Sequence, residues 1–294
     1  MSPRPNTFII GAPKSGTTSI ARWLGEHPDV FMSTPKEPYY FCRPSLQLAG
    51  IREPEQYAAL FAAAQDALVI AEATTAILYD DTALPRILRF APDARIIVML
   101  RNPVELTLSW YGECVRHLRE NIGDFPTAWE AIEDRRVGKR IPPECADPLM
   151  LDYRYIASLG SHLGRVRKLV PTKQLHVAFL DDFVTDPRTA WLQLLEFLNL
   201  PDDRRAEFAA ENVGYFKGNV ASYRALRALA DKAKQLLRLR GGTGLVEKLA
   251  RGHRKRRPRL DEEFRSVLRR EFEPEISALE QITGRDLSQW RRQS

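Results

Sequence analysis

The hydrophobic pattern of the chain switches between two periods, and this switching predicts an α/β fold. Short apolar runs, which are typical of strands in a parallel sheet, occupy residues 8–10, 30–32, 67–71, 95–100 and 175–180. Apolar residues at helical spacing, which predict amphipathic helices, fill residues 17–24, 54–66, 84–90, 151–170, 191–198 and 262–290. Strands that alternate with helices form a central parallel sheet with helices on both faces. The chain is therefore expected to be a three-layer α/β protein.

The loop after the first strand carries the clearest chemical signal. It lies between two glycines, and a helix is predicted directly after it. Such a strand–loop–helix unit directs backbone N–H groups and one lysine toward a common point, which suits a phosphate or sulfate group. The glycines have the spacing of the nucleotide-binding P-loop, but Thr17 stands where that motif has its lysine. The candidate anion-binding residues are Pro13, Lys14, Ser15, Gly16, Thr17 and Thr18.

Two acidic residues are candidates for proton transfer. Glu37 lies beside Lys36 in a segment that two prolines hold extended. Glu72 follows the apolar run at 67–71, so it is expected at the carboxyl end of a strand. Open α/β sheets bind ligands at that edge. Glu72 is therefore expected near a bound ligand, whereas Lys36 and Glu37 lie close in sequence to the anion-binding loop or form a solvated ion pair in a surface turn.

A second anion-binding pair is predicted where the strand at 95–100 ends. Arg101 follows this strand, and a helix is expected from Asn102 and Pro103. Ser109 lies within the first two turns of that helix. Arg101 and Ser109 are expected to converge on one phosphate.

Composition narrows the class of protein without identifying it. A chain of 294 residues without internal repeats is expected to form one domain, 1–294. Its net charge of +6 favours anionic ligands, while no recognised motif predicts a specific nucleic-acid partner. Three widely spaced cysteines argue against a disulfide framework and a zinc site. No signal peptide or transmembrane run is predicted, so a cytoplasmic location is expected.

Three segments have weaker patterns. Prolines and charges at 119–150 predict an exposed insertion. Phe216, Lys217 and Gly218 combine an aromatic ring, a cation and a close-approach backbone, which suits a nucleotide. Residues 224–259 hold 13 Lys and Arg against 2 Asp and Glu, and we interpret them as a solvated face or as a lid that attracts an anionic ligand.

With these elements placed, the chain resembles the sulfotransferases that use 3′-phosphoadenylyl sulfate (PAPS), and most closely the heparan-sulfate-type branch. Residues 11–18, GAPKSGTT, are similar to the family's 5′-phosphosulfate loop, including its internal lysine. Residues 101–109 resemble its 3′-phosphate site, and residues 36–41, KEPYYF, resemble the segment whose glutamate is the base. Residues 71–75, AEATT, resemble a block that usually reads G-E-x-[ST]-P, with Ala71 and Thr75 as departures.

The resemblance implies a P-loop-type fold and a set of roles. Lys14 would stabilise the charge on the leaving phosphosulfate oxygen. Arg101 and Ser109, with Phe216, Lys217 and Gly218, would hold the rest of the nucleotide. Glu37 would be the general base, with Glu72 as reserve base or as a group that orients the acceptor. The reaction needs PAPS, yields adenosine 3′,5′-bisphosphate, and requires no metal.

Two other functions stay open at this point. A P-loop kinase or NTPase that uses ATP and magnesium would fit the glycine spacing, although Lys14 is misplaced for it. Asp181–Asp182, after the strand at 175–180, would be its magnesium ligands, but we interpret them as capping the next turn. A non-catalytic polyanion-binding protein would use the basic residues of 224–259. The acceptor, whether small molecule, lipid or carbohydrate, and the oligomeric state are not predicted.

Overall fold

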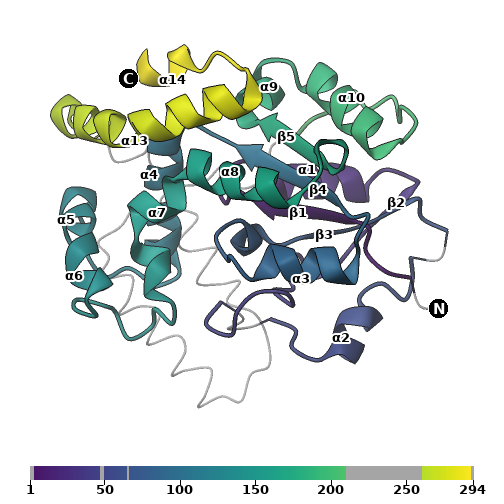
Figure 1. Ribbon diagram of the computed structural model, residues 1–294, viewed down its shortest axis with the longest axis horizontal. Coiled ribbons are helices and arrows are strands. Elements are labelled where there is room, and N and C mark those ends of the chain that lie inside the picture. The colour runs from purple at the N-terminus through teal and green to yellow at the C-terminus, as the bar shows by residue number, and fades with distance from the viewer. Residues whose placement is uncertain (1–2, 47–49, 65, 210–259, 293–294) are drawn as a thin grey trace. The chain divides into compact units, whose positions relative to one another are not determined.

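The computed structural model describes residues 3–46, 50–64, 66–209 and 260–292. Its centre is a five-stranded sheet in the order β2-β3-β1-β4-β5, in which all paired strands run parallel (Figure 1). The strands are β1 Thr7–Gly11, β2 Val30–Met32, β3 Val69–Ala73, β4 Arg95–Leu100 and β5 Leu175–Phe179. The predicted parallel sheet is confirmed.

Helices and short 3-10 turns connect these strands and complete the chain. They are α1 Thr17–Gly25, α2 Pro54–Ala59, η1 Thr75–Leu78, α3 Ala83–Phe90, α4 Pro103–Arg116, α5 Phe125–Glu130, α6 Ile132–Arg136, η2 Pro148–Leu151, α7 Tyr153–Ala157, α8 Leu159–Leu169, η3 Thr172–Gln174, α9 Leu180–Thr185, α10 Pro187–Leu198, α13 Glu262–Thr283 and α14 Ser288–Arg292.

The strand order places a topological switch beside β1. Ile9 of β1 lies opposite Ala73 of β3 on one side and Ile97 of β4 on the other. The chain leaves β1 toward β2 and β3, and it later crosses to β4 and β5. Ligands of open α/β sheets bind where the strand order reverses in this way, outside the carboxyl ends of the strands. The loop after β1 lies at that position.

Both faces of the sheet are covered, because successive residues of a strand point to opposite sides. Ile9 belongs to a buried core cluster with α1 and α10, which contribute Trp23 and Trp191. Phe8 faces the other way and meets the ring of Phe41 at 6.0 Å between centroids. Phe41 in turn contacts Phe90 of α3 at 5.4 Å. The predicted helices on both faces are therefore confirmed (Figure 1).

Four predicted boundaries were wrong. The helix expected at 151–170 divides into α7 and α8, and the helix expected at 262–290 divides into α13 and α14. The other two boundaries differ for a common reason. The strand expected at 67–71 is β3, Val69–Ala73, because Leu68 is 60% exposed whereas Glu72 is held inside the sheet. The helix expected at 54–66 ends much earlier, as α2 Pro54–Ala59. In both cases tertiary contacts override the local apolar pattern.

The chain divides into two compact units. One consists of Met1–Leu106, Ser158–Asn212 and Arg269–Gln293, and it contains the sheet. The other consists of Thr107–Ala157, Val213–Leu268 and Ser294. The prediction of a single domain stays a prediction.

The second unit corrects the expectation of an exposed segment at 119–150 in part, because residues 136–140 are exposed whereas other side chains of the segment form a core. Phe125, Trp129 and Ile132 are buried there. Glu120 is also fully buried, and its carboxylate accepts hydrogen bonds from Arg135 at 2.8 Å and from the Tyr153 hydroxyl at 2.6 Å. The buried ion pair of Glu120 with Arg135 thus lies in the core of this segment, with both charges hydrogen-bonded.

Within the described residues, no helix is both long and apolar enough to cross a membrane.

Candidate active site

The loop between β1 and α1 has a shape that requires its two glycines. Gly11 has φ 154 and a Cβ there would lie 2.6 Å from Cβ of Leu78, while Gly16 has φ 85 and its Cβ would lie 2.9 Å from Cδ1 of Leu180. Gly16 is also the N-cap of α1, so the loop delivers the chain directly into the helix. The first N–H groups of a helix have no intrahelical acceptor and favour a negative group.

The remaining predicted loop residues surround this turn. Ser15 and Thr17 are buried, while Lys14 and Thr18 are partly exposed. Lys14 adopts φ 61, a left-handed conformation that is uncommon outside glycine and is often found at functional sites. The backbone of this loop is therefore held in one specific shape.

Arg101 links the end of β4 to the same loop. Its Nη1 donates a hydrogen bond of 2.8 Å to the backbone carbonyl of Lys14, and its Nη2 lies 3.7 Å from Oε2 of Glu105. Both charged side chains are largely buried, at 13% and 16% exposed. Arg101 thus adds positive charge next to the loop and fixes the position of Lys14.

Glu37 lies at the carboxyl edge of β3. Its backbone N–H donates to the carbonyl of Ala73 at 2.9 Å. Its carboxylate accepts hydrogen bonds from Lys36 Nζ at 2.8 Å, from Thr75 Oγ1 at 3.1 Å and from the Tyr39 hydroxyl at 2.5 Å. The side chain is 23% exposed, so it is both firmly held and accessible.

Glu72 is placed differently, inside β3 and 1% exposed. Its Oε2 accepts a hydrogen bond of 3.0 Å from the Tyr57 hydroxyl, and the Thr74 side chain also interacts with this carboxyl group. Burial raises the pKa of Glu72 to about 8, the donation from Tyr57 opposes this, and the nearby charge of Glu37 adds to it. At neutral pH this carboxyl group is mainly protonated.

The structure brings some predicted residues together and leaves others apart. Lys14 and Arg101 share a hydrogen bond, and Glu37 and Glu72 lie near enough for their charges to interact. Ser109 lies in α4 and is 8% exposed. Phe216, Lys217, Gly218 and the basic stretch 224–259 lie outside the described residues.

Three residues of the site were not predicted as contacts. Tyr39 and Thr75 bind Glu37, and Tyr57 binds Glu72. Tyr39 and Thr75 lie within residues 36–41 and 71–75, the two segments whose family resemblance predicted the site. Tyr57 lies in a predicted amphipathic helix outside these segments, and nothing in the sequence indicated its contact with Glu72.

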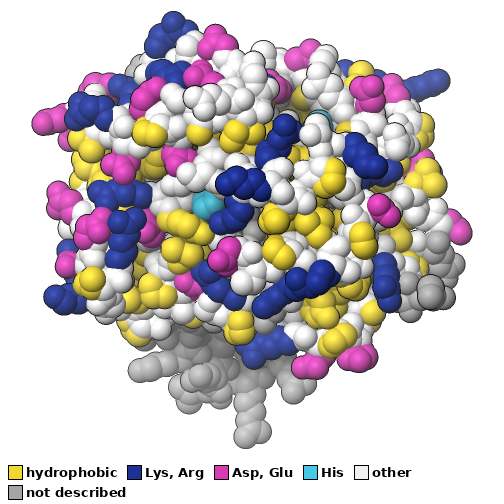
Figure 2. Space-filling view, in the orientation of Figure 1, with side chains coloured by type: hydrophobic (Ala, Val, Ile, Leu, Met, Phe, Trp, Pro, Cys, Tyr) yellow, Lys and Arg dark blue, Asp and Glu magenta, His cyan; other side chains and the backbone are white. Residues whose placement is uncertain are grey.

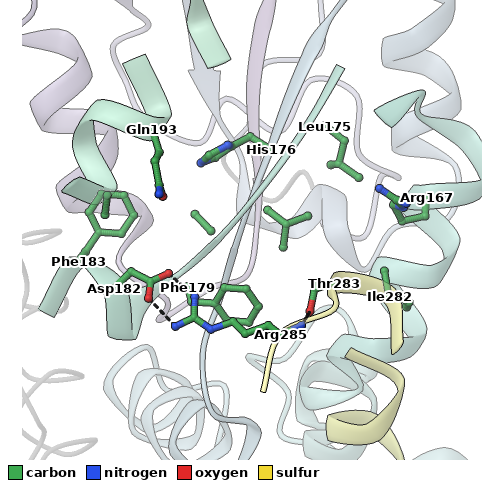
Figure 3. Close-up of a pocket in the computed structure, with 13 residues that line it drawn as sticks. Arg167, Leu175, His176, Phe179, Asp182, Phe183, Gln193, Ile282, Thr283 and Arg285 are labelled. Carbon is green, nitrogen blue, oxygen red and sulfur yellow. Dashed lines mark hydrogen bonds and ion pairs between the residues drawn. The ribbon is translucent and has the colours of Figure 1, made fainter. Parts of the chain in front are cut away.

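The interpretation of Asp181 and Asp182 is corrected. Both lie in the first turn of α9, but neither caps it. Asp181 accepts a hydrogen bond from the indole of Trp290, and Asp182 forms a two-bond ion pair with Arg285 (Figure 3). These aspartates attach the C-terminal segment to α9. The cavity beside them, about 360 Å³ along β5, has none of the loop residues in its lining.

Two further observations concern metal sites and the charge of the surface. Among the described residues, no group of three or more His, Cys, Asp and Glu side chains is arranged to hold a metal ion. Figure 2 shows basic and acidic side chains mixed over the face in view.

Comparison with known proteins gives a consistent result. A family model described as "Sulfotransferase domain" matches residues 4–221. The crystal structure of a sulfotransferase from Alicyclobacillus acidocaldarius superposes with a TM-score of 0.73 at 25% sequence identity, covering 99% of this chain and 100% of that one.

Curated relatives include two named sulfotransferases. Human carbohydrate sulfotransferase 15 is 26% identical over 278 residues, which cover 79% of this chain and 46% of the relative. Human heparan sulfate glucosamine 3-O-sulfotransferase 6 is 29% identical over 139 residues, which cover 44% of this chain and 39% of the relative. The chain thus spans less than half the length of these relatives.

Proposed function

Because this chain belongs to the sulfotransferase domain family, we propose that it transfers a sulfuryl group from PAPS to a hydroxyl or amine of an acceptor. In that reaction the acceptor atom forms a bond to sulfur while the bond from sulfur to the bridging phosphate oxygen breaks, and this oxygen keeps the electron pair. Adenosine 3′,5′-bisphosphate is the second product. The chain must therefore bind a charged nucleotide, stabilise a leaving oxygen and remove one proton.

The loop after β1 fits the phosphate end of such a donor. Gly16 is the N-cap of α1 and packs so closely against Leu180 that a Cβ would lie 2.9 Å from Cδ1 of that residue. The loop therefore ends at a helix N-terminus, whose free N–H groups suit a phosphate. Lys14 would neutralise charge on the leaving oxygen. Arg101 would hold Lys14 in place and add positive charge for the nucleotide. The proposed roles of Ser109 and of Phe216, Lys217 and Gly218 rest on sequence alone.

The single observation that carries the choice of base is the contrast between Glu37 and Glu72. The Glu37 side chain is 23% exposed, and three donors bind its carboxylate, as suits an ionised group. Glu72 is 1% exposed with a pKa of about 8. A carboxyl group that is already protonated cannot accept the acceptor's proton. We therefore assign the base to Glu37 and a structural role to Glu72.

The acceptor class follows only from the relatives. The names of two curated relatives give heparan sulfate glucosamine and carbohydrate as their acceptors. A carbohydrate hydroxyl is accordingly the first acceptor class to screen, followed by small-molecule and lipid alcohols. The screen incubates the protein with labelled PAPS and each acceptor and measures transfer of the label to the acceptor.

Donor binding can be tested without knowing the acceptor. Calorimetric titration with adenosine 3′,5′-bisphosphate in EDTA, beside ATP with magnesium, separates the proposal from a kinase. We expect tight metal-free binding of the bisphosphate. A preference for magnesium and ATP would contradict the proposed donor.

The base assignment needs a pair of matched variants. Glu37→Gln should bind the bisphosphate as the native protein does and lose transfer. Glu72→Gln should keep transfer, because a neutral amide resembles a protonated carboxyl group. Full activity in Glu37→Gln, or loss of activity only in Glu72→Gln, would show that the base is not Glu37.

A further inference from the structure

The two oxygens of the Glu37 carboxylate have different surroundings. Oε1 accepts hydrogen bonds from Lys36 Nζ at 2.8 Å and from Thr75 Oγ1 at 3.1 Å. Oε2 accepts one hydrogen bond, from the Tyr39 hydroxyl at 2.5 Å. A carboxylate oxygen offers two lone pairs to donors. Within the described part of the chain, Oε1 is therefore filled and Oε2 keeps one open position.

The donors to Oε1 differ in how firmly they are held. Lys36 is 26% exposed and adjoins Glu37 in sequence, and its ammonium sits on a long, flexible stem. Thr75 is 6% exposed and begins η1, directly after β3. A short β-branched side chain has restricted rotamers. Thr75 is thus the more rigid anchor.

The backbone around Glu37 reinforces this geometry. Glu37 and Tyr39 both adopt left-handed conformations, with φ 62 and φ 56. The N–H of Glu37 donates to the carbonyl of Ala73, close to Thr75 in the chain. Non-glycine residues hold such conformations when the surrounding contacts determine them. Two segments distant in sequence, 36–39 and 73–75, therefore fix one carboxylate together.

We propose that Thr75 is a positioning residue that fixes Oε1 of Glu37 and leaves Oε2 to take the acceptor's proton. The inference rests on the proposed function, in which Glu37 is the base. The acceptor's O–H or N–H bond breaks, and the proton goes to the open lone pair of Oε2. The electron pair of that bond stays on the acceptor atom and is available for bonding to sulfur. Thr75 itself exchanges no proton with the acceptor.

The test compares three substitutions of one residue. Thr75→Val keeps the shape and removes the hydroxyl, Thr75→Ala removes it with less bulk, and Thr75→Ser keeps it. We expect Val and Ala to lower kcat by roughly 10- to 100-fold, the scale of a misplaced catalytic group. The KM for PAPS and the affinity for adenosine 3′,5′-bisphosphate should not change. Thr75→Ser should restore kcat to within about threefold.

Thr82 provides a matched control. Its hydroxyl donates a hydrogen bond of 2.8 Å to the carboxylate of Asp80, so Thr82→Val removes the same kind of contact away from Glu37. Thr82→Val should leave kcat unchanged. Thermal unfolding and bisphosphate titration of each variant confirm that it is folded before its kcat is interpreted.

The outcomes separate the two proposals. If Glu37→Gln is inactive while Thr75→Val and Thr75→Ala turn over as the native protein does, the positioning role is wrong and the base assignment stands. A loss in Thr75→Ser equal to that in Thr75→Val would equally overturn the role of the hydroxyl. If Glu37→Gln is fully active, the base assignment is wrong, and the positioning role of Thr75 is wrong with it, while sulfuryl transfer itself stands.

Discussion

The guanidinium of Arg101 donates a hydrogen bond of 2.8 Å to the backbone carbonyl of Lys14. This contact joins the residue that follows β4 to the loop that follows β1, two neighbouring strands of the sheet. Arg101 is therefore both a positive charge beside the proposed donor site and a support for the residue proposed to act on the leaving oxygen.

Arg101→Ala should weaken binding of adenosine 3′,5′-bisphosphate. Loss of a hydrogen-bond partner of a charged group costs about 1.5–3 kcal/mol, which corresponds to roughly 10- to 100-fold in affinity. Calorimetric titration measures this directly.

Arg95 is the matched control for that variant. Arg95 Nη1 donates to the carbonyl of Leu198 at 2.7 Å, so it makes the same kind of contact at the opposite end of β4. Arg95→Ala should lower stability without changing the affinity. Equal losses of affinity in both variants would show that Arg101 acts only through the stability of the sheet.

Lys14→Ala should mainly lower turnover. The ammonium group is proposed to stabilise charge that develops on the leaving oxygen, and such interactions strengthen in the transition state. By analogy with other charge-stabilising donors, the expected loss in kcat is roughly 100- to 1,000-fold. The affinity for adenosine 3′,5′-bisphosphate should fall much less.

Lys14→Arg tests whether charge alone suffices. It keeps the positive charge but changes its geometry, so its kcat should lie between those of the native protein and Lys14→Ala. A variant Lys14→Ala with native kcat and weakened nucleotide affinity would reverse the proposed role, because Lys14 would then serve binding alone.

The sequence predicted the strands and the loop that form this site better than the side-chain contacts within it. Strands β4 and β5 lie at the apolar runs that predicted them, and the two glycines correctly predicted the turn after β1. The pairing of Lys36 with Glu37 was also accessible, because the two residues adjoin. These features depend on residues close together in the chain.

The contacts of Thr75 and Tyr57 could not be predicted in the same way. Thr75 reaches Glu37 only because β2 pairs with β3 and brings the two following segments together. Tyr57 reaches Glu72 from α2, across the face of the sheet. The ion pair of Asp182 with Arg285 joins residues still farther apart. Such contacts depend on strand order and side-chain packing, which the local pattern does not encode.

Glu72 should make the protein less stable as pH rises. Its pKa is about 8 in the folded protein because of burial, against an ordinary value of 4.5. Between these values the folded state binds more protons than the unfolded state, so the free energy of unfolding falls with pH. The contribution is fully present below about pH 4.5 and is lost as pH rises through about 8. Its slope is at most about 1.4 kcal/mol per pH unit.

The pH effect is measured by denaturant unfolding of the native protein and Glu72→Gln between pH 5 and pH 9. The stability of Glu72→Gln relative to the native protein should rise across this range and level off above about pH 8. Glu26→Gln is the control, because Arg205 and Arg22 lower the pKa of the exposed Glu26 and so cannot cause this trend. A constant difference between native protein and Glu72→Gln would show that Glu72 is ionised when folded.

Gly16→Ala should damage the loop in two ways. Gly16 has φ 85, a conformation that costs a side-chain-bearing residue roughly 1–2 kcal/mol. An added Cβ would also lie 2.9 Å from Cδ1 of Leu180, so the tip of that side chain must shift. Because the loop is the proposed phosphate site, bisphosphate affinity should fall together with stability.

Gly138→Ala separates these two effects. Gly138 has φ 80, yet a Cβ there meets no atom within 4 Å. It should therefore show the backbone cost alone, with native affinity for adenosine 3′,5′-bisphosphate. The difference between the two variants in unfolding free energy then reports the contact with Leu180. If Gly16→Ala keeps native affinity despite lower stability, the exact shape of the loop is not what binds the nucleotide.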